Sequence, residues 1–252
     1  MIVKPCLPPS APATFNICHV TNLIHSQPAK SQSRETHFRA ALYKRALPVA
    51  AGAEDALSLY DAIAAGEATL NLRARYESAD QDGKDAGNAA TLQSLVGWRT
   101  KAFWNTSLAV EAINVGRLND NYNDGQNGKT QYPVIGDPDD TDFNQLYVDW
   151  TAVPATRIRG GRQVIKLDNV RFVGNVAFRQ VMQVFNGVTV ENTSLPNTRL
   201  FFGYIGRVKT VDTRQHDTDT ILLNANYTLS ADKSLVAYGY FQDQYDAIGG
   251  AG

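Results

Sequence analysis

The sequence predicts an all-β fold, namely an antiparallel transmembrane β-barrel. We count about nine strands, which is part of a larger barrel, so the predicted barrel is incomplete. Three observations lead to this prediction. Apolar and polar residues alternate with a period of two after Gly66, and the connections between the alternating segments are by turns short and long. No apolar run reaches the roughly eighteen residues of a transmembrane helix, whereas a barrel strand needs only about ten alternating residues.

Composition excludes several functional classes. A net charge of -1 over 252 residues argues against a nucleic-acid-binding chain. Both cysteines, Cys6 and Cys18, lie near the N-terminus, which gives no disulfide framework and no cysteine-based metal site. Three of the four histidines, His19, His25 and His37, precede the alternating region, so a histidine-dependent catalytic or metal site has little support. We therefore expect no cofactor, no metal and no enzymatic activity.

The chain divides into a leader and a barrel part. Residues 1–53 show no sustained periodicity, and we expect a leader of uncertain origin that is poorly ordered or resembles the end of an export signal. Residues 54–252 form the predicted barrel part. Within it, residues 54–67 carry apolar side chains at helical spacing up to Gly66, which predicts one short helix.

The first two strands show the alternation most clearly. In "TLNLRARYE", Leu70, Leu72, Ala74 and Tyr76 share one face, and charged or amide side chains occupy the other. In "TLQSLVGWR" the apolar face carries Leu92, Val96 and Trp98, and only Ser94 and Leu95 break the rule.

Later segments continue the pattern with less regularity. They are "SLAVEAINV", "FNQLYVDW", "TRIRGGR", "FNGVTVEN", "RLFFGYIGR", "ILLNANYT" and "SLVAYGYFQ". The short turns "KAFWN", "AVPA", "SLPN" and "SADK" are expected at one rim, and the longer connections, including "VKTVDTRQHDTD", at the other. Aromatic candidates for the membrane interface are Trp98, Trp104, Trp150, Tyr204, Tyr227 and Tyr238.

A soluble antiparallel sandwich or lipocalin-like barrel would also alternate. In that case the chain would be a soluble all-β carbohydrate-binding domain that uses Trp and Tyr as platforms. The regular change between long and short connections favours the membrane barrel, as do strands with an apolar face and no helix to cover it.

Four longer motifs resemble the bacterial alginate-export family of outer-membrane porins. They are "LRARYE", "YNDGQNGKTQYPVIGDP", "RGGRQVIKLDNVRFVGNVAFRQ" and "NTSLPNTRLFFGYIGRV", and the resemblance covers about residues 58–252. It implies location in the cell outer membrane, contact with outer-membrane lipid, and a polar lumen that passes an anionic polysaccharide or a related small anionic solute. Family barrels have about twice the strands counted here, so the resemblance extends to an N-terminal part of the barrel.

The basic residues are expected to face the lumen, because a charge facing lipid at mid-depth costs about 2–4 kcal/mol. Arg159 and Arg162 both face inward only if Gly160–Gly161 forms a bulge, and a second break near Asp168 must separate Lys166 from Arg171. The candidate solute-binding residues are Arg73, Arg75, Arg99, Arg159, Arg162, Lys166, Asn169, Arg171, Arg179, Gln180 and Gln183. Arginine suits this task because its planar group binds carboxylates bidentately and stays protonated.

Each arginine could instead pair with an acidic residue across the lumen and only satisfy a buried charge. The glycine and asparagines in "DNVRFVGNVAFRQ" suggest a segment that leaves the sheet and narrows the lumen, with an ordinary external loop as the alternative. The loop from Asn119 to Asp142 is rich in Asp and Asn but fails the EF-hand spacing, which favours a solvated loop over a calcium site.

Overall fold

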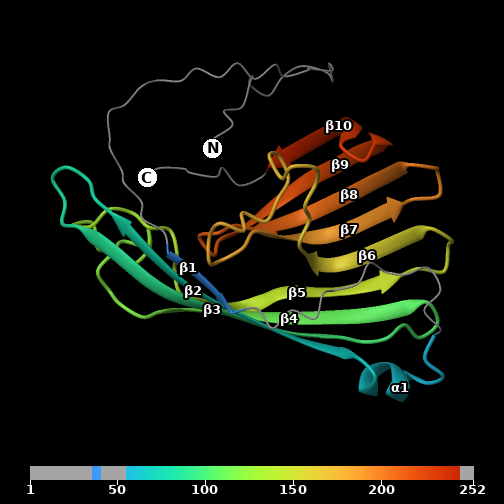
Figure 1. Cartoon of the computed structure of the whole chain (residues 1–252), viewed down its shortest axis with the longest axis horizontal. Coiled ribbons are helices and arrows are strands. Elements are labelled where there is room, and N and C mark those ends of the chain that lie inside the picture. The colour runs from blue at the N-terminus through green and yellow to red at the C-terminus, as the bar shows by residue number, and fades with distance from the viewer. Residues whose placement is uncertain (1–35, 41–54, 245–252) are drawn as a thin grey trace. The chain divides into compact units, whose positions relative to one another are not determined.

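The computed structural model describes residues 55–243 in full and the backbone of residues 36–40 and 244. Ten strands form one antiparallel sheet in which the strand order is the chain order (Figure 1). The strands are β1 (Thr36–Ala40), β2 (Glu67–Ala79), β3 (Gly87–Arg99), β4 (Thr106–Arg117), β5 (Asp140–Trp150), β6 (Thr156–Gln163), β7 (Val184–Asn192), β8 (Thr198–Lys209), β9 (Gln215–Ser230) and β10 (Lys233–Gln244).

The all-β prediction is confirmed, and the nine predicted strands correspond to β2–β10. β1 adds a short strand that pairs with β2, with Thr36 opposite Tyr76. The rest of the predicted leader lies outside the described residues. Within the described sheet, β1 and β10 are the two edge strands, so this sheet is open. In the part of the chain that the structure describes, no helix has the length and apolarity needed to cross a membrane.

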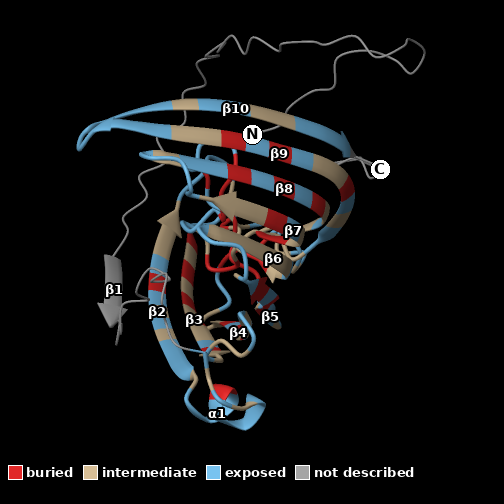
Figure 2. Ribbon diagram, turned by 90° about the vertical axis from the view of Figure 1, so that its right-hand side faces the viewer, coloured by how far each residue is buried: buried red, intermediate tan, exposed pale blue. Residues whose placement is uncertain are grey.

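The sheet has an exposed apolar outer face, and its inner face carries both polar and apolar buried side chains. Large side chains on the outer, convex face are exposed; they include Leu70, Leu72, Tyr76, Val96, Leu108, Phe143, Leu146, Val148, Trp150, Val188, Leu200, Phe202, Tyr204, Ile221, Leu223, Tyr227, Leu235 and Phe241. Buried residues gather on the concave side of the curve (Figure 2). Tyr238 departs from the prediction, because it stands opposite Asn224 on the inner face and stacks on Tyr240, with ring centroids 5.0 Å apart.

The connections alternate as predicted, with the short ones at one rim. These short turns cover residues 100–105, 151–155, 193–197 and 231–232. One expectation is wrong: most of "VKTVDTRQHDTD" is strand, because β9 begins at Gln215 and pairs with β8. The two long connections, called here the rim loop (residues 118–139) and the inner loop (residues 164–183), both leave the opposite rim.

The predicted short helix is confirmed as α1 (Leu59–Ala64). Its first turn is capped by Ser58, whose Oγ accepts a hydrogen bond from the Asp61 backbone N–H at 3.1 Å. The helix ends at Ala64, and its C-cap Ala65 is followed by Gly66 and the start of β2.

The apolar core lies between the inner loop and the inner face of the sheet. Ile165, Leu167 and Val173 of the inner loop pack with Phe185, Phe201, Ile205 and Leu222 of β7, β8 and β9. Val181 forms a second cluster with Ile113 and Val115 of β4, and Leu95 packs against it. This contact explains why Leu95 breaks the alternation: it stands on the inner face beneath the inner loop. The expectation that this segment leaves the sheet and folds inward is confirmed.

One glycine, Gly161, and a register shift on β4 shape the wall. The predicted bulge at Gly160–Gly161 is absent, since β5 and β6 pair without a register shift. Gly161 instead has a φ of 127°, and a Cβ there would lie 2.3 Å from the Leu146 carbonyl oxygen. The register shifts between Glu111 and Ala112 on β4, so two consecutive β5 residues, Asn144 and Gln145, both reach Glu111.

Candidate functional site

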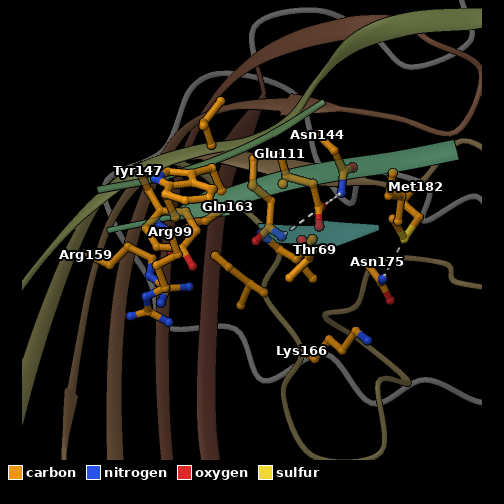
Figure 3. A pocket seen from close by; sticks show the side chains of 18 of the residues that line it. Thr69, Arg99, Glu111, Asn144, Tyr147, Arg159, Gln163, Lys166, Asn175 and Met182 are labelled. Carbon is orange, nitrogen blue, oxygen red and sulfur yellow. Dashed lines mark hydrogen bonds between the residues drawn. The ribbon is translucent and has the colours of Figure 1, made fainter. Parts of the chain in front are cut away.

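The inner face carries a pocket of about 1110 Å³, bounded by strands of the sheet and by the inner loop (Figure 3). Its lining is mixed in charge. The basic side chains are Arg99, Arg157, Arg159, Lys166 and Arg199, and the acidic ones are Glu67, Glu111 and Glu191. In the part of the chain that the structure describes, no three His, Cys, Asp or Glu side chains are grouped as metal ligands.

Two of these arginines share one buried carboxylate. Arg159 donates from Nε and Nη2 to Asp149 at 2.6 and 2.8 Å, and Arg99 donates from Nη2 to the same group at 2.7 Å. The Asp149 side chain is 2% exposed, whereas that of Arg99 is 36% exposed. The Arg159 guanidinium also lies 3.7 Å from the centroid of the Tyr147 ring. Two positive charges against one negative charge leave an excess of one at this group.

A second group repeats the two-to-one ratio. Arg157 and Arg199 both donate to the Glu191 carboxylate, at 3.3 and 2.8 Å. Arg157 stands directly opposite Glu191 in the β6–β7 ladder, and Arg199 reaches it from β8. The side chains of Arg157 and Arg199 are 32% and 44% exposed, so their remaining N–H groups can face the pocket.

Three further charges, those of Lys166, Glu111 and Glu67, lie in the pocket without an ion pair among the described residues. Lys166 is exposed on the inner loop. Glu111 is held by two neutral amides, because Asn144 and Gln145 donate to it at 2.6 and 3.0 Å. With Asp149 counted beneath the surface, the pocket keeps a net excess of one positive charge.

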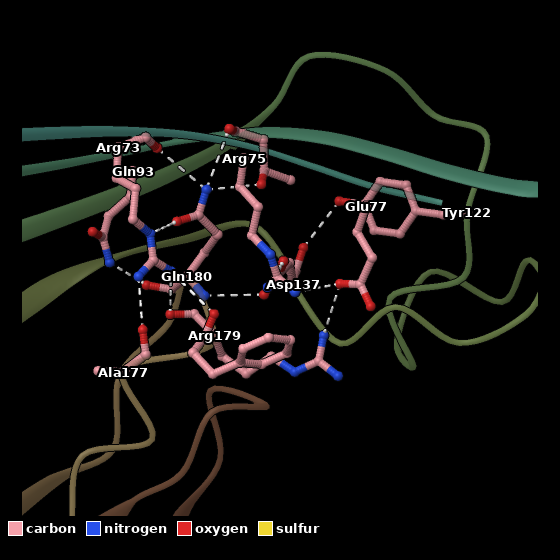
Figure 4. Close-up of polar contacts among 11 residues, drawn as sticks. Arg73, Arg75, Glu77, Gln93, Tyr122, Asp137, Ala177, Arg179 and Gln180 are labelled. Atoms are coloured by element: carbon pink, nitrogen blue, oxygen red, sulfur yellow. Dashed lines mark hydrogen bonds and ion pairs between the residues drawn. The ribbon is translucent and has the colours of Figure 1, made fainter. Parts of the chain in front are cut away.

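Other predicted site residues anchor the inner loop instead (Figure 4). Arg73 donates to the carbonyl oxygens of Ala177 and Arg179 at 2.7 and 2.5 Å, and to Gln180 Oε1 at 2.7 Å. Gln180 is fully buried; its Nε2 donates to Thr91 Oγ1 at 2.8 Å. We therefore assign Arg73 and Gln180 to the attachment of the inner loop, and the predicted solute contact is wrong for the buried Gln180.

The same correction applies to Arg75. This residue is 3% exposed and forms ion pairs with Glu77 and with Asp137, the latter at 2.6 Å. Arg179, at the end of the inner loop, pairs with Glu77 at 3.3 Å. The alternative in which an arginine satisfies a buried acid thus holds for Arg75. Its partner Asp137 comes from the rim loop, whose Asp- and Asn-rich composition was noted but gave no sign of this pairing.

The remaining predicted residues are scattered. Arg162 stands opposite Leu146 in the ladder and pairs with Asp142 at 2.7 Å, so it does not share a face with Arg159. β6 ends at Gln163, so Lys166, Asn169, Arg171 and Gln183 all belong to the inner loop, whereas Lys166 and Arg171 were expected among the basic residues of the wall. Asn169 and Arg171 are exposed there, and Gln183 donates to the Gly174 carbonyl oxygen at 3.0 Å.

Two pocket arginines, Arg157 and Arg199, were missed in the sequence. Arg157 lies two residues before Arg159 on the same strand, so the period of two already places it on the same face. Arg199 lies two residues before the inward Phe201. Both could have been found by extending the alternation to the ends of their strands.

Comparison with known proteins shows the fold. The sequence matches no protein-family model and no curated protein. The crystal structure of Pseudomonas aeruginosa OccD3 (OpdP) has a TM-score of 0.51 at 17% identity, covering 70% of this chain and 40% of that one. That of Acinetobacter baumannii OccAB1 has a TM-score of 0.55 at 16% identity, covering 73% of this chain and 46% of that one.

Both neighbours are outer-membrane porins, and the chain spans less than half the length of either. The predicted outer-membrane localisation agrees with this likeness. The likeness does not extend to the alginate-export family in particular, which stays a prediction from the sequence motifs. The sheet described here therefore has the fold of part of an outer-membrane porin barrel.

Proposed function

We propose that this chain forms part of the wall of an outer-membrane channel that passes anionic solutes passively, without a cofactor and without a catalytic step. Two features support a channel: the porin-type fold, and the division of the sheet into an exposed apolar outer face and an inner face that carries the charged pocket. Exposed Leu, Val, Phe and Trp side chains on adjacent strands suit contact with outer-membrane lipid, where charged side chains are costly.

The observation that carries the anionic preference is the net positive charge of the pocket, in which four arginines and Lys166 outnumber Glu67, Glu111, Glu191 and the buried Asp149 by one. Each shared carboxylate, Asp149 or Glu191, holds two arginines, and Lys166 has no ionic partner among the described residues. Partly exposed guanidinium groups such as that of Arg199 keep free N–H donors that can bind a solute carboxylate. Low-dielectric walls around the pocket concentrate the field of this excess charge.

For the solute, the resemblance in the sequence favours an alginate-like polysaccharide, a polymer that carries one carboxylate on each sugar ring. Two separate arginine groups and Lys166 in a single pocket would offer weak, repeated sites to such a chain. Weak repeated sites suit transport because a solute must bind well enough to enter and loosely enough to leave. A small anionic solute would use the same groups one at a time.

The alternative, a soluble all-β carbohydrate-binding domain, has less support. Its sheet would expose residues such as Leu146 (44%) and Val148 (43%) to water along a whole face. Size-exclusion chromatography of the full-length protein separates the two: we expect a monodisperse species only in detergent, and a monodisperse species without detergent would favour the soluble domain.

The charge preference is tested with the double variant Lys166→Gln/Arg199→Gln in the full-length protein. We expect its reversal potential in a salt gradient to move away from anion preference, and the effect to be larger at low salt because the screening length is then longer. Lys101→Gln is the matched control, since Lys101 is exposed on the β3–β4 turn and does not line the pocket. Equal potentials for the double variant and the wild type would refute the anionic preference.

A further inference from the structure

The carboxylate of Asp137, on the rim loop, connects three separate parts of the chain. Its Oδ2 accepts from Arg75 of β2 at 2.6 Å, and its Oδ1 accepts from the Gln180 backbone N–H of the inner loop at 3.0 Å. The Asp137 carbonyl oxygen accepts from the Tyr122 hydroxyl at 2.9 Å, which ties the residue to the rest of the rim loop. Asp137 is fully buried, so these contacts replace contacts with water.

The inner loop has a strained backbone in the residues that precede the contact with Asp137. Val170 and Val176 have positive φ values, 56° and 50°, and Asp168 has a φ of 52°. A positive φ is rare for a β-branched residue because Cβ then crowds the backbone. Such strain persists only where surrounding contacts impose it. The anchors found at the end of this loop, on Arg73 and Asp137, are contacts of that kind.

We propose that Asp137 is a latch that positions the inner loop across the passage, so that the rim loop controls how far the inner loop narrows it. Asp137 is here a positioning residue, because it does not bind the solute itself. It fixes the inner loop through its hydrogen bonds with Gln180 and Arg75. Loss of the latch frees the Gln180 end of the strained inner loop from the inner face, whereas Ile165, Leu167 and Val173 still hold the rest of the loop against β7–β9. The effect on passage rests on the proposed channel function, whereas the latch itself does not.

The experiment compares Asp137→Ala with Asp139→Ala in the full-length protein. Asp139 is a matched control on the same loop, because it pairs with Arg117 and is 46% exposed, without contact to the inner loop. Hydrogen exchange of the Gln180 amide measures the latch directly. We expect exchange on the order of tenfold to a hundredfold faster in Asp137→Ala and unchanged in Asp139→Ala, because a buried partner is lost only in the former.

Asp137→Ala leaves Arg75 with Glu77 as its remaining ionic partner shown here, and the variant can fail to fold for that reason. Asp137→Asn keeps the volume of the side chain and one acceptor oxygen but loses the carboxylate charge, so it weakens the contacts with Arg75 and Gln180 with less disturbance of the packing. Trypsin cleavage after Arg179 is its readout, and we expect at least tenfold faster cleavage than in the wild type.

Single-channel conductance then connects the latch to passage. We expect a larger and noisier conductance in whichever latch variant folds. Faster exchange or cleavage with an unchanged conductance would support the latch and count against the inner loop as the narrowest part of a channel. Unchanged exchange and cleavage in both latch variants would overturn the proposal, whatever the conductance.

Discussion

Replacing Asp149 by Asn should destabilise the protein and strengthen the proposed anion preference at the same time. The carboxylate is 2% exposed and receives a bidentate contact from Arg159, whose side chain is 12% exposed. Breaking a buried ion pair from one side costs about 3–5 kcal/mol. Asn keeps the shape and one acceptor oxygen, so we expect the lower end, about 3 kcal/mol. The contact with the more exposed Arg99 adds less than about 1 kcal/mol because water screens it.

Urea unfolding of the full-length protein in lipid vesicles measures the loss. With a slope of about 1–3 kcal/mol per molar urea, a loss of about 3 kcal/mol lowers the midpoint by roughly 1–3 M. Asp217→Asn is the control, since Asp217 pairs with Arg207 on the exposed surface and its midpoint should not move. In bilayers, the uncompensated Arg99 and Arg159 should increase anion preference. A wild-type midpoint together with a wild-type reversal potential would show that the shared carboxylate matters for neither property.

Two further predictions concern the wall and the rim loop. Gly161→Ala should lose the heat-modifiable gel migration of a folded barrel, because a Cβ there would lie 2.3 Å from a backbone oxygen at a φ of 127°. Gly160→Ala should keep this migration, because a Cβ at that position has nothing within 4 Å. Equal migration of the two variants would refute the claim that Gly161 is required by backbone strain. Burial raises the pKa of Tyr122 above its usual 10.0, so its packing contributes fully below about pH 10 and is lost as the pH rises through the higher folded-state value. Trypsin cleavage of the rim loop after Lys129 should therefore become faster at alkaline pH in the wild type but not in Tyr122→Phe. The rate is divided by that of a free peptide with the rim-loop sequence, which removes the pH dependence of trypsin itself. The same acceleration in both proteins would assign the effect to another group.

Alternation along the chain predicted the faces of the strands well, because the side-chain period of a strand is a local property. Leu92, Val96 and Trp98 stand on the outer face as expected. Even the exception at Leu95 has a local signature, an apolar residue in an inward position. What it packs against, Val181 of the inner loop, is distant in the sequence and could not be inferred from the strand itself.

The roles of the arginines were predicted less well, because a role depends on partners far along the chain. Arg75 meets a carboxylate 62 residues away, and Arg73 meets an amide 107 residues away. A sequence pattern gives the face of a side chain but not which distant acid or carbonyl reaches it. Arg162 shows a related difficulty, because it was expected to face inward only with a bulge at Gly160–Gly161, and that bulge is absent. The register shifts instead between β4 and β5 at Glu111. The position of a bulge depends on both strands of a pair and cannot be inferred from one of them.

The two long connections leave the same rim, but they would meet different surroundings in an outer membrane. The inner loop is packed against the inner face of the sheet by Val181 and Gln180, so it would lie on the lumen side of the wall and away from the rim, where antibodies and phages bind first. The rim loop exposes its tip at Gly125 and Gly128 and buries its base at Asp137. Variation that changes recognition from outside can therefore accumulate at the tip, only about ten residues from a carboxylate that cannot change without moving the inner loop.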